Sequence, residues 1–192
     1  MLNSVNIKSF FPLILLSLLI IGCSAGRGVS EYQQYLTNET VRGNNSPITA
    51  KVPAGWYQAL DNKDNLIDIW LIKEDNSALL NLMRINIDDA SVKEAGGTLL
   101  EASLKYSKTF KKASADYTFE LAGGDEYTSI GSFDAGIYKY KTKSGAIARV
   151  LLFIHSGTVY ELTALPAPKT NPQNFNYEEL YRAQNALLSS VE

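Results

Sequence analysis

Side chains that catalyse reactions or bind metals are scarce in this sequence. The 192 residues include one cysteine, Cys23, and one histidine, His155. A zinc site needs several histidine or cysteine ligands, and this pair is too few. His155 follows an apolar run and precedes a Ser-Gly turn, which favours a structural place at the end of a strand. The sequence therefore predicts no catalytic residues, no metal site and no bound cofactor.

Two acidic segments offer carboxylates instead. The run Gly123-Gly124-Asp125-Glu126-Tyr127 is similar to the signature of diguanylate cyclases, but tyrosine replaces the final phenylalanine and the family's other elements are missing. We expect a hairpin with a Gly-Gly turn, and an enzyme that uses Asp125 and Glu126 alone is the weakest of three hypotheses. Residues 61–65 resemble a calcium loop but lack its later ligands and its glycine, so we expect a polar turn.

Cys23 ends an apolar segment that is too short to cross a membrane. Residues 10–21 are apolar except for Pro12 and Ser17, whereas a spanning helix needs roughly 20 apolar residues. Small residues surround the cysteine, with Gly22 before it and Ser24 after it. This order is typical of a signal peptide rather than a membrane span.

The residues before Cys23 resemble the lipobox of bacterial lipoproteins. Ile20 and Ile21 supply the aliphatic positions, and Gly22 the small residue before an obligatory cysteine. The resemblance implies cleavage between Gly22 and Cys23, a diacylglyceryl group on the thiol, and an acyl chain such as palmitate on the new amine. Two or three acyl chains anchor a protein stably. Ser24 favours the outer membrane, facing the periplasm; the alternative is an ordinary signal peptide with a chance cysteine.

Composition indicates one ordinary globular domain after the signal. The chain is 45% hydrophobic and 20% charged, with a net charge of −2, which argues against nucleic acid as a partner. Lipidation of Cys23 would leave no thiol for a disulfide. We expect a signal peptide over residues 1–22, a lipidated cysteine and flexible tether over 23–47, and a folded domain over 48–192.

Hydrophobic patterning within 48–192 predicts an α+β fold. Alternation and turn residues predict a mostly antiparallel central sheet of about six to seven strands flanked by two helices. The continuous apolar run at residues 147–154 predicts a strand covered on both faces. The strands are expected at residues 48–52, 68–73, 78–87, 117–121, 127–130, 133–142, 146–155 and 158–165.

The two helices are predicted from capping residues and apolar spacing. The first begins at Ser91, with Glu94 completing a capping box, and ends near Lys112. The second begins at Asn176, with Glu179 in the same role. The buried stripe of the first helix is expected to comprise Val92, Ala95, Leu99, Ala102, Tyr106 and Phe110, and that of the second Leu180, Ala183, Leu187 and Val191.

Several segments also resemble the PsbP-like family, named after an extrinsic photosystem II protein. They are Val52-Pro53-Ala54-Gly55-Trp56, Gly136-Ile137-Tyr138-Lys139-Tyr140, Ser156-Gly157-Thr158-Val159-Tyr160-Glu161-Leu162 and Leu187-Leu188-Ser189-Ser190-Val191. The resemblance covers about residues 48–191. It implies an α/β/α sandwich with an antiparallel sheet, and it supplies no catalytic residues.

The favoured function is a membrane-anchored envelope lipoprotein that acts as a non-catalytic interaction, assembly or accessory module. Its partners would be the membrane, through the lipid, and an unidentified envelope protein. The alternative is a periplasmic small-ligand or lipid-binding carrier, which predicts an apolar pocket. Four lysines on the first helix, Lys105, Lys108, Lys111 and Lys112, are expected to form a solvated face or to contact anionic lipid or a partner.

Overall fold

The structure, a computed structural model, describes residues 31–60 and 66–192. Gly22 and Cys23, and with them the proposed cleavage and lipidation site, lie outside the described residues. So does the calcium-like segment at residues 61–65. What the structure tests is therefore the folded domain and the second half of the expected tether.

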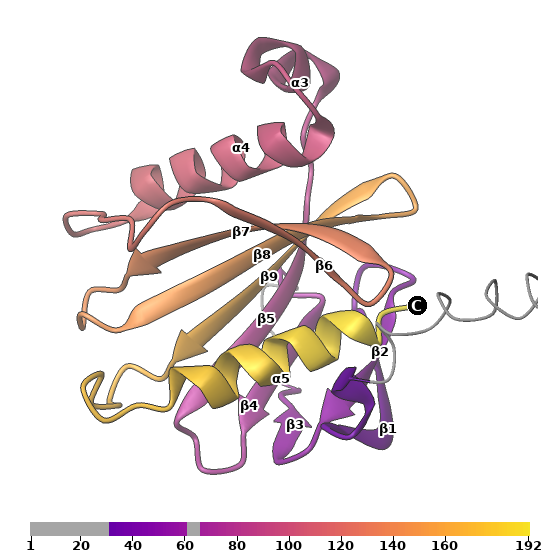
Figure 1. The fold of residues 1–192 in the computed structure, drawn as a ribbon, viewed down its shortest axis with the longest axis vertical. Coiled ribbons are helices and arrows are strands. Elements are labelled where there is room, and N and C mark those ends of the chain that lie inside the picture. The colour runs from indigo at the N-terminus through magenta and orange to yellow at the C-terminus, as the bar shows by residue number, and fades with distance from the viewer. Residues whose placement is uncertain (1–30, 61–65) are drawn as a thin grey trace, which may run out of the picture.

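In the described residues a run of strands, a pair of helices, a second run of strands and a last helix follow one another, the order expected for an α+β domain (Figure 1). The strands are β1 (Leu36–Arg42), β2 (Thr49–Pro53), β3 (Trp56–Gln58), β4 (Ile69–Lys73), β5 (Ala78–Ile85), β6 (Glu126–Ile130), β7 (Phe133–Lys141), β8 (Ile147–His155) and β9 (Thr158–Pro166). The helices are α3 (Asp89–Ala95), α4 (Leu99–Ser114) and α5 (Tyr177–Ser189).

Seven strands form one antiparallel sheet between two helices. The strand order is β3-β4-β5-β9-β8-β7-β6, while β1 and β2 pair separately. Helix α4 lies over one face of the large sheet and α5 over the other (Figure 1). The predicted α+β class and the layered arrangement are confirmed.

The core lies on both faces of the central strands, because each helix buries one face. Residues 148–153 of β8 are all buried, as the continuous apolar run predicted. On the α5 side the packing includes Leu180, Ala183 and Leu187, three residues of the predicted stripe. On the α4 side Leu104 packs over Gly136 of β7, where an added Cβ would lie 2.6 Å from the Leu104 Cδ1. The sheet thus needs a glycine at that contact.

The tether prediction is wrong for the second half of its range. Strand β1 lies within residues 23–47 and pairs with β2 in an antiparallel hairpin. Val41 and Ile48 are buried in the core on the α5 side. The backbones of Thr49 and Glu192 exchange two hydrogen bonds, which join β2 to the C-terminus. Because β1 is polar in composition, its sequence did not predict a strand. Its place in the fold depends on pairing with β2, which in turn is bonded to the C-terminus.

The first helix is broken where a single helix was predicted. Gly96 and Gly97 have φ angles of 68° and 87°, a left-handed conformation that glycine adopts without steric cost. Helix α3 therefore ends there, and α4 begins after Thr98, which forms a capping box with Glu101. Asp88, rather than Ser91, is the N-cap of α3.

Helix α4 is also rotated relative to the predicted stripe. Tyr106 and Phe110 are 41% and 60% exposed. The buried residues are Ala102, Ser103, Leu104 and Ser107. Two serines thus face the sheet where aromatic residues were expected, because the sheet presents polar groups at this point.

Two further differences are local. Residues 117–121 form one isolated bridge, Leu121 to Tyr140, instead of a strand. Strand β3 was not predicted; it follows a turn at Gly55, whose φ is 79°. The predicted N-cap Asn176 of α5 is confirmed, since its side chain accepts a hydrogen bond from the Glu179 backbone N–H.

Candidate functional site

A buried carboxylate lies between α4 and the sheet. Glu161 is on the central strand β9 and is 2% exposed. Because strand side chains alternate between faces, Glu161 and Thr163 point to the α4 side while Tyr160 and Leu162 join the core on the α5 side. A buried charge is stable only when it is paired and hydrogen-bonded.

Residues of α4 and β9 satisfy the Glu161 carboxylate, and Tyr138 of β7 extends the network through Ser107. Ser107 Oγ of α4 donates to Glu161 Oε2 over 2.5 Å, and Thr163 Oγ1 donates to Oε1 over 2.9 Å. Lys111 Nζ forms an ion pair with Oε1 at 2.8 Å. Tyr138 OH lies 2.7 Å from Ser107 Oγ. Since Ser107 gives its single proton to Glu161, Tyr138 must donate to Ser107.

Tyr138 is held in its neutral form. Burial, reinforced by the negative charge of Glu161, raises the pKa of the Tyr138 phenol far above its usual value. The proton chain therefore runs from Tyr138 to Ser107 to Glu161. Ser107 is 1% exposed, and its one proton is donated to the Glu161 carboxylate, which Thr163 and Lys111 also contact. These contacts link α4 to the sheet and indicate a structural role for the hydroxyl.

A pocket of about 370 Å³ opens beside this network. Its polar lining comes from Arg84, Asn86, Ser107, Lys111 and Glu161. Its apolar lining comes from β5, α4 and the segment before β4: Leu66, Met83, Ile85, Tyr106 and Phe110. Such a volume falls in the range, about 300–1,000 Å³, of small-molecule sites. The side chains can therefore accommodate an apolar body next to one polar contact.

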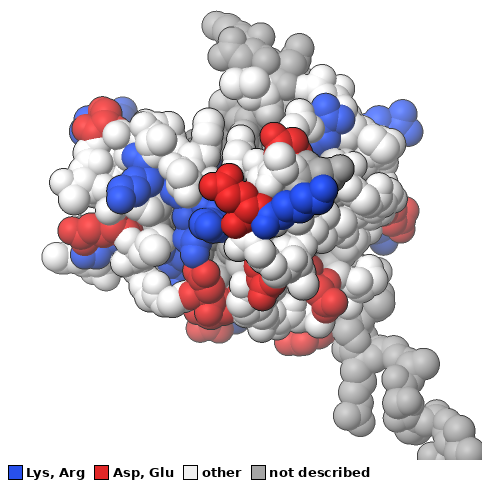
Figure 2. Space-filling view, turned by 90° about the horizontal axis from the view of Figure 1, so that it is seen from above, with Lys and Arg blue, Asp and Glu red and all other residues white. Residues whose placement is uncertain are grey.

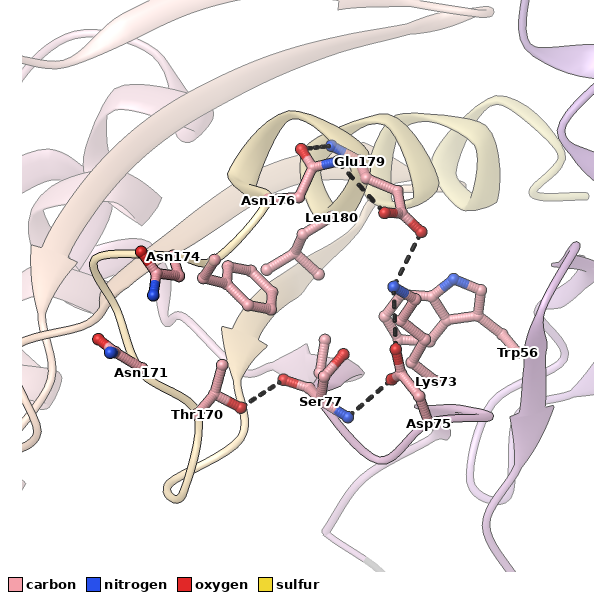
Figure 3. Close-up of a pocket in the computed structure, with 12 residues that line it drawn as sticks. Trp56, Lys73, Asp75, Ser77, Thr170, Asn171, Asn174, Asn176, Glu179 and Leu180 are labelled. Atoms are coloured by element: carbon pink, nitrogen blue, oxygen red, sulfur yellow. Dashed lines mark hydrogen bonds and ion pairs between the residues drawn. The ribbon is translucent and has the colours of Figure 1, made fainter.

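A second pocket, of about 320 Å³, lies between the β4–β5 turn and the start of α5 (Figure 3). Lys73 stands between two carboxylates, 2.9 Å from Glu179 Oε1 and 3.3 Å from Asp75 Oδ2. Trp56 and Leu180 form part of its wall. The loop before α5 is tied in by Thr170 Oγ1, which donates to the Ser77 carbonyl over 3.0 Å.

One cation and two carboxylates meet at this second pocket. Burial lowers the pKa of Lys73, but its hydrogen bonds and ion pairs with Glu179 and Asp75 outweigh that effect and leave the pKa raised. Hydrogen bonds from Ser77 lower the pKa of Asp75. Lys73 and Asp75 are thereby held in their charged forms, and the pair joins a turn to a helix without supplying an activated acid or base.

The sequence-predicted carboxylates form separate ion pairs. Asp125 Oδ2 lies 2.7 Å from Lys108 Nζ, and Glu126 Oε1 lies 2.8 Å from Lys139 Nζ. The expected hairpin with a Gly-Gly turn is wrong: Leu121 before the glycines and Glu126 after them both pair with β7, and the β6–β7 turn lies at Gly131-Ser132. His155 ends β8 and contacts the rings of Phe133 and Tyr160, at centroid distances of 5.8 and 6.5 Å. The strand-end interpretation of His155 is confirmed.

Helix α4 does not present four free lysines. Lys105 and Lys112 are exposed, but Lys108 and Lys111 are paired with Asp125 and Glu161. Viewed from the α4 side, basic and acidic side chains alternate over the surface (Figure 2). No extended field of one sign appears on this face, so electrostatic attraction to a polyanion has little basis there.

A second buried charge lies on the other face. Arg149 of β8 is 8% exposed, and burial lowers its pKa. It donates to Asn185 Oδ1 over 2.9 Å and to Gln184 Oε1 over 3.3 Å, both on α5. Its guanidinium also lies over the Tyr181 ring. Arg149 thus ties α5 to the sheet as Glu161 ties α4.

Residues 31–60 and 66–192 contain neither a cluster of metal-binding side chains nor a membrane-spanning helix. These residues include no group of three or more histidine, cysteine, aspartate or glutamate side chains placed to hold a metal ion. Among them, no helix is long and apolar enough to cross a bilayer.

Sequence reasoning missed Glu161, Ser107 and Arg149 as the polar anchors of the two helices. A signal was present, because Glu161 and Arg149 are isolated charges within apolar strands. Their partners are not visible in sequence, since Ser107 and Gln184 lie 54 and 35 residues away from them.

Comparison with known proteins shows a fold at low sequence identity. Neither a protein-family profile nor a curated protein sequence matches this chain. The solution structure of cyanobacterial PsbP (CyanoP) from Synechocystis sp. PCC 6803 is similar, with a TM-score of 0.54 and 13% identity over 80% of this chain and 91% of that one. A crystal structure from Bacteroides thetaiotaomicron VPI-5482 gives a TM-score of 0.40 and 11% identity over 76% of this chain and 44% of the other. The described domain therefore has a PsbP-like fold.

Proposed function

We propose that this protein is a membrane-anchored lipoprotein of the bacterial envelope whose domain acts as a non-catalytic accessory module. The observation that carries the proposal is the sequence Ile20-Ile21-Gly22-Cys23 after a short apolar segment. In this proposal Cys23 is the first mature residue and carries the lipid. Ser24 supports placement at the outer membrane, facing the periplasm.

The state of the ionisable groups supports a non-catalytic role. In the described part of the chain, Asp125, Glu126 and Glu161 each form an ion pair with a different lysine. A general acid or base needs access to a substrate and a pKa near the working pH. Glu161 is 2% exposed and already accepts from Ser107, Thr163 and Lys111, and the other two belong to surface pairs. The PsbP-like fold agrees with an accessory role without establishing it.

The folded hairpin β1–β2 brings the domain closer to the membrane than a long tether would. Between Cys23 and the first described residue, Glu31, the chain offers residues 24–30. A segment of that length spans at most about 28 Å when fully extended and roughly 15 Å on average if flexible. The partner we propose is therefore an envelope protein at or near the membrane surface.

Intact mass and fractionation test the anchor. Protein extracted from cell envelopes is expected to begin at Cys23, to carry a diacylglyceryl group and to sediment with membranes. Cys23→Ala should abolish the lipid mass and leave an unprocessed or soluble chain. Ser24→Ala, which keeps Ile20–Cys23 unchanged, is the matched control and should be processed like the wild type. An unlipidated wild-type chain, cleaved elsewhere, would refute the anchor.

A further inference from the structure

The pocket between α4 and β5 gathers apolar side chains that are unusually exposed. Phe110, Tyr106 and Leu66 are 60%, 41% and 70% exposed, and all three line this one pocket. Met83 and Ile85 of β5 lie on the same sheet face and extend the apolar lining. Exposed apolar surface that is concentrated at one concave site marks a binding site more often than scattered residues do.

The polar wall of the pocket has a definite hydrogen-bonding capacity. The Lys111 ammonium carries three donors, and within the described part of the chain Glu161 is its one partner. The carboxylate oxygens of Glu161 already accept from Ser107, Thr163 and Lys111. Asn86, just after β5, also lines the pocket. Within the Lys111–Glu161 pair, the unmet capacity is donor capacity from Lys111, which a ligand oxygen can accept.

The paired charges of the wall select the charge of the ligand. Arg84 also lines the pocket, but it is in register with Tyr160 of the core on the α5 side, so its side chain points to the opposite face of the sheet. On the α4 side, Lys111 and Glu161 together carry no net charge. An anionic head group would approach the Glu161 carboxylate, and a cationic one would approach the Lys111 ammonium; each would lose hydration without a free counter-charge. A neutral carbonyl or ester oxygen incurs neither cost and satisfies the donor.

We propose that the α4–β5 pocket binds an uncharged, lipid-like molecule with a long apolar body and a carbonyl or ester oxygen, which accepts a hydrogen bond from Lys111. Phe110, Tyr106 and Met83 would surround the apolar body. The pocket belongs to the folded domain, so the inference does not depend on lipidation of Cys23 or on a protein partner.

Photolabelling with a matched series of probes tests the inference. The full chain in phosphatidylcholine vesicles is irradiated with three diazirine-bearing long-chain compounds that differ in the head group: a methyl ester, a carboxylate and an alkylammonium. Adducts are located by peptide mass spectrometry. The ester is expected to label residues 106–111 and 83–86 most strongly. Equal labelling by all three, or adducts spread over the surface, would overturn the proposal.

Variants separate binding from simple partitioning into the vesicle. Phe110→Ser should lower labelling by the ester about fivefold, the effect of losing part of a phenyl ring's burial. Tyr127→Ser removes a similarly exposed aromatic residue outside the pocket and should change nothing. Circular dichroism confirms that each variant folds. Unchanged labelling in folded Phe110→Ser would also overturn the proposal.

A double variant tests the expected preference for an ester head group. Lys111→Met combined with Glu161→Met replaces the ion pair by apolar side chains, a change that proteins often tolerate. In this double variant the ester should lose its advantage over a matched alkane probe, while both still label the pocket. An ester preference that survives the loss of Lys111 would contradict the assigned hydrogen bond.

Discussion

Glu161 and Arg149 place one buried charge on each face of the sheet, and each charge holds a helix. Their cost is desolvation, and the hydrogen bonds from α4 and α5 offset it. The arrangement also fixes the rotation of α4 about its axis. Ser107 can meet Glu161 only when α4 is rotated so that Tyr106 and Phe110 point outward, which forms the apolar side of the α4–β5 pocket.

Removing one partner of the Lys111–Glu161 ion pair should lower the free energy of unfolding more than removing both partners. Lys111→Met leaves the carboxylate buried without a counter-charge, and we expect about 3 kcal/mol loss in the free energy of unfolding. The Lys111→Met, Glu161→Met double variant should recover most of that loss. Lys112→Met, at an exposed neighbour, is the control and should change stability by less than about 0.5 kcal/mol. Urea denaturation at neutral pH measures all three.

A single-variant loss that is no larger than the Lys112→Met effect would contradict the network. It would mean that Glu161 does not depend on Lys111 for its charge compensation.

Buried tyrosines predict loss of stability in alkali. Burial raises the pKa of Tyr181 to about 12 from a usual value of 10.0. A group whose pKa is raised on folding contributes stability that is complete below pH 10 and falls as the pH rises toward 12, because the unfolded chain releases the proton first. Tyr181→Phe should therefore flatten the decline in stability between these pH values.

Denaturant titrations at pH 9 to 11 measure this effect. Tyr57→Phe, at an exposed tyrosine, serves as the control and should leave the decline unchanged. Equal pH dependence in the wild type and Tyr181→Phe would contradict the assigned burial.

At the residue scale, the sequence placed His155 correctly at the end of a strand. It misplaced the hairpin near Asp125 and Glu126, whose turn lies at Gly131 rather than at Gly123-Gly124. The stripe of α4 was assigned by hydrophobicity alone, which selects Tyr106 and Phe110. The helix instead turns Ser103 and Ser107 inward, because the sheet beneath it presents the side chains of Glu161 and Tyr138.

At the scale of elements, periodicity predicted the sheet well and its interruptions poorly. Strands β4, β5, β7, β8 and β9 lie within a few residues of their predicted bounds, since buried alternation specifies them. The break between α3 and α4 follows from two consecutive glycines with positive φ, and periodicity cannot detect such a reversal. Strand β1 has no apolar run, and its place depends on β2 and on the C-terminus.

The close contact between α4 and β7 gives a prediction for one glycine. Gly136→Ala would place a Cβ 2.6 Å from Leu104 Cδ1 and 3.0 Å from its Cγ, so α4 must shift or Leu104 must leave its rotamer. We expect a loss of about 1–3 kcal/mol, the usual cost of overpacking. Thermal or urea unfolding measures it.

Gly124→Ala is the matched control. An added Cβ at Gly124 meets no atom within 4 Å, so the variant should be as stable as the wild type. Equal stability of Gly136→Ala and Gly124→Ala would contradict the packing of α4 on the sheet.

At the scale of the whole molecule, the domain and the proposed anchor rest on different observations. The described domain has a PsbP-like fold, and Glu161 and Arg149 join its helices to the sheet. The anchor is proposed from the residues up to Cys23. If Cys23 carries the lipid, the fold of residues 36–53 leaves a short segment between the lipid and the domain and would limit partners to those close to the membrane.

Chemical crosslinking in intact cell envelopes, through a tag on the C-terminus, tests the central claim most directly. The account predicts that the wild type captures the same envelope protein in every repeat, and that Cys23→Ala, expressed to the same level and folded, captures at least about tenfold less because the anchor supplies local concentration. No reproducible partner for the wild type, or equal capture by Cys23→Ala, would contradict a membrane-anchored interaction module.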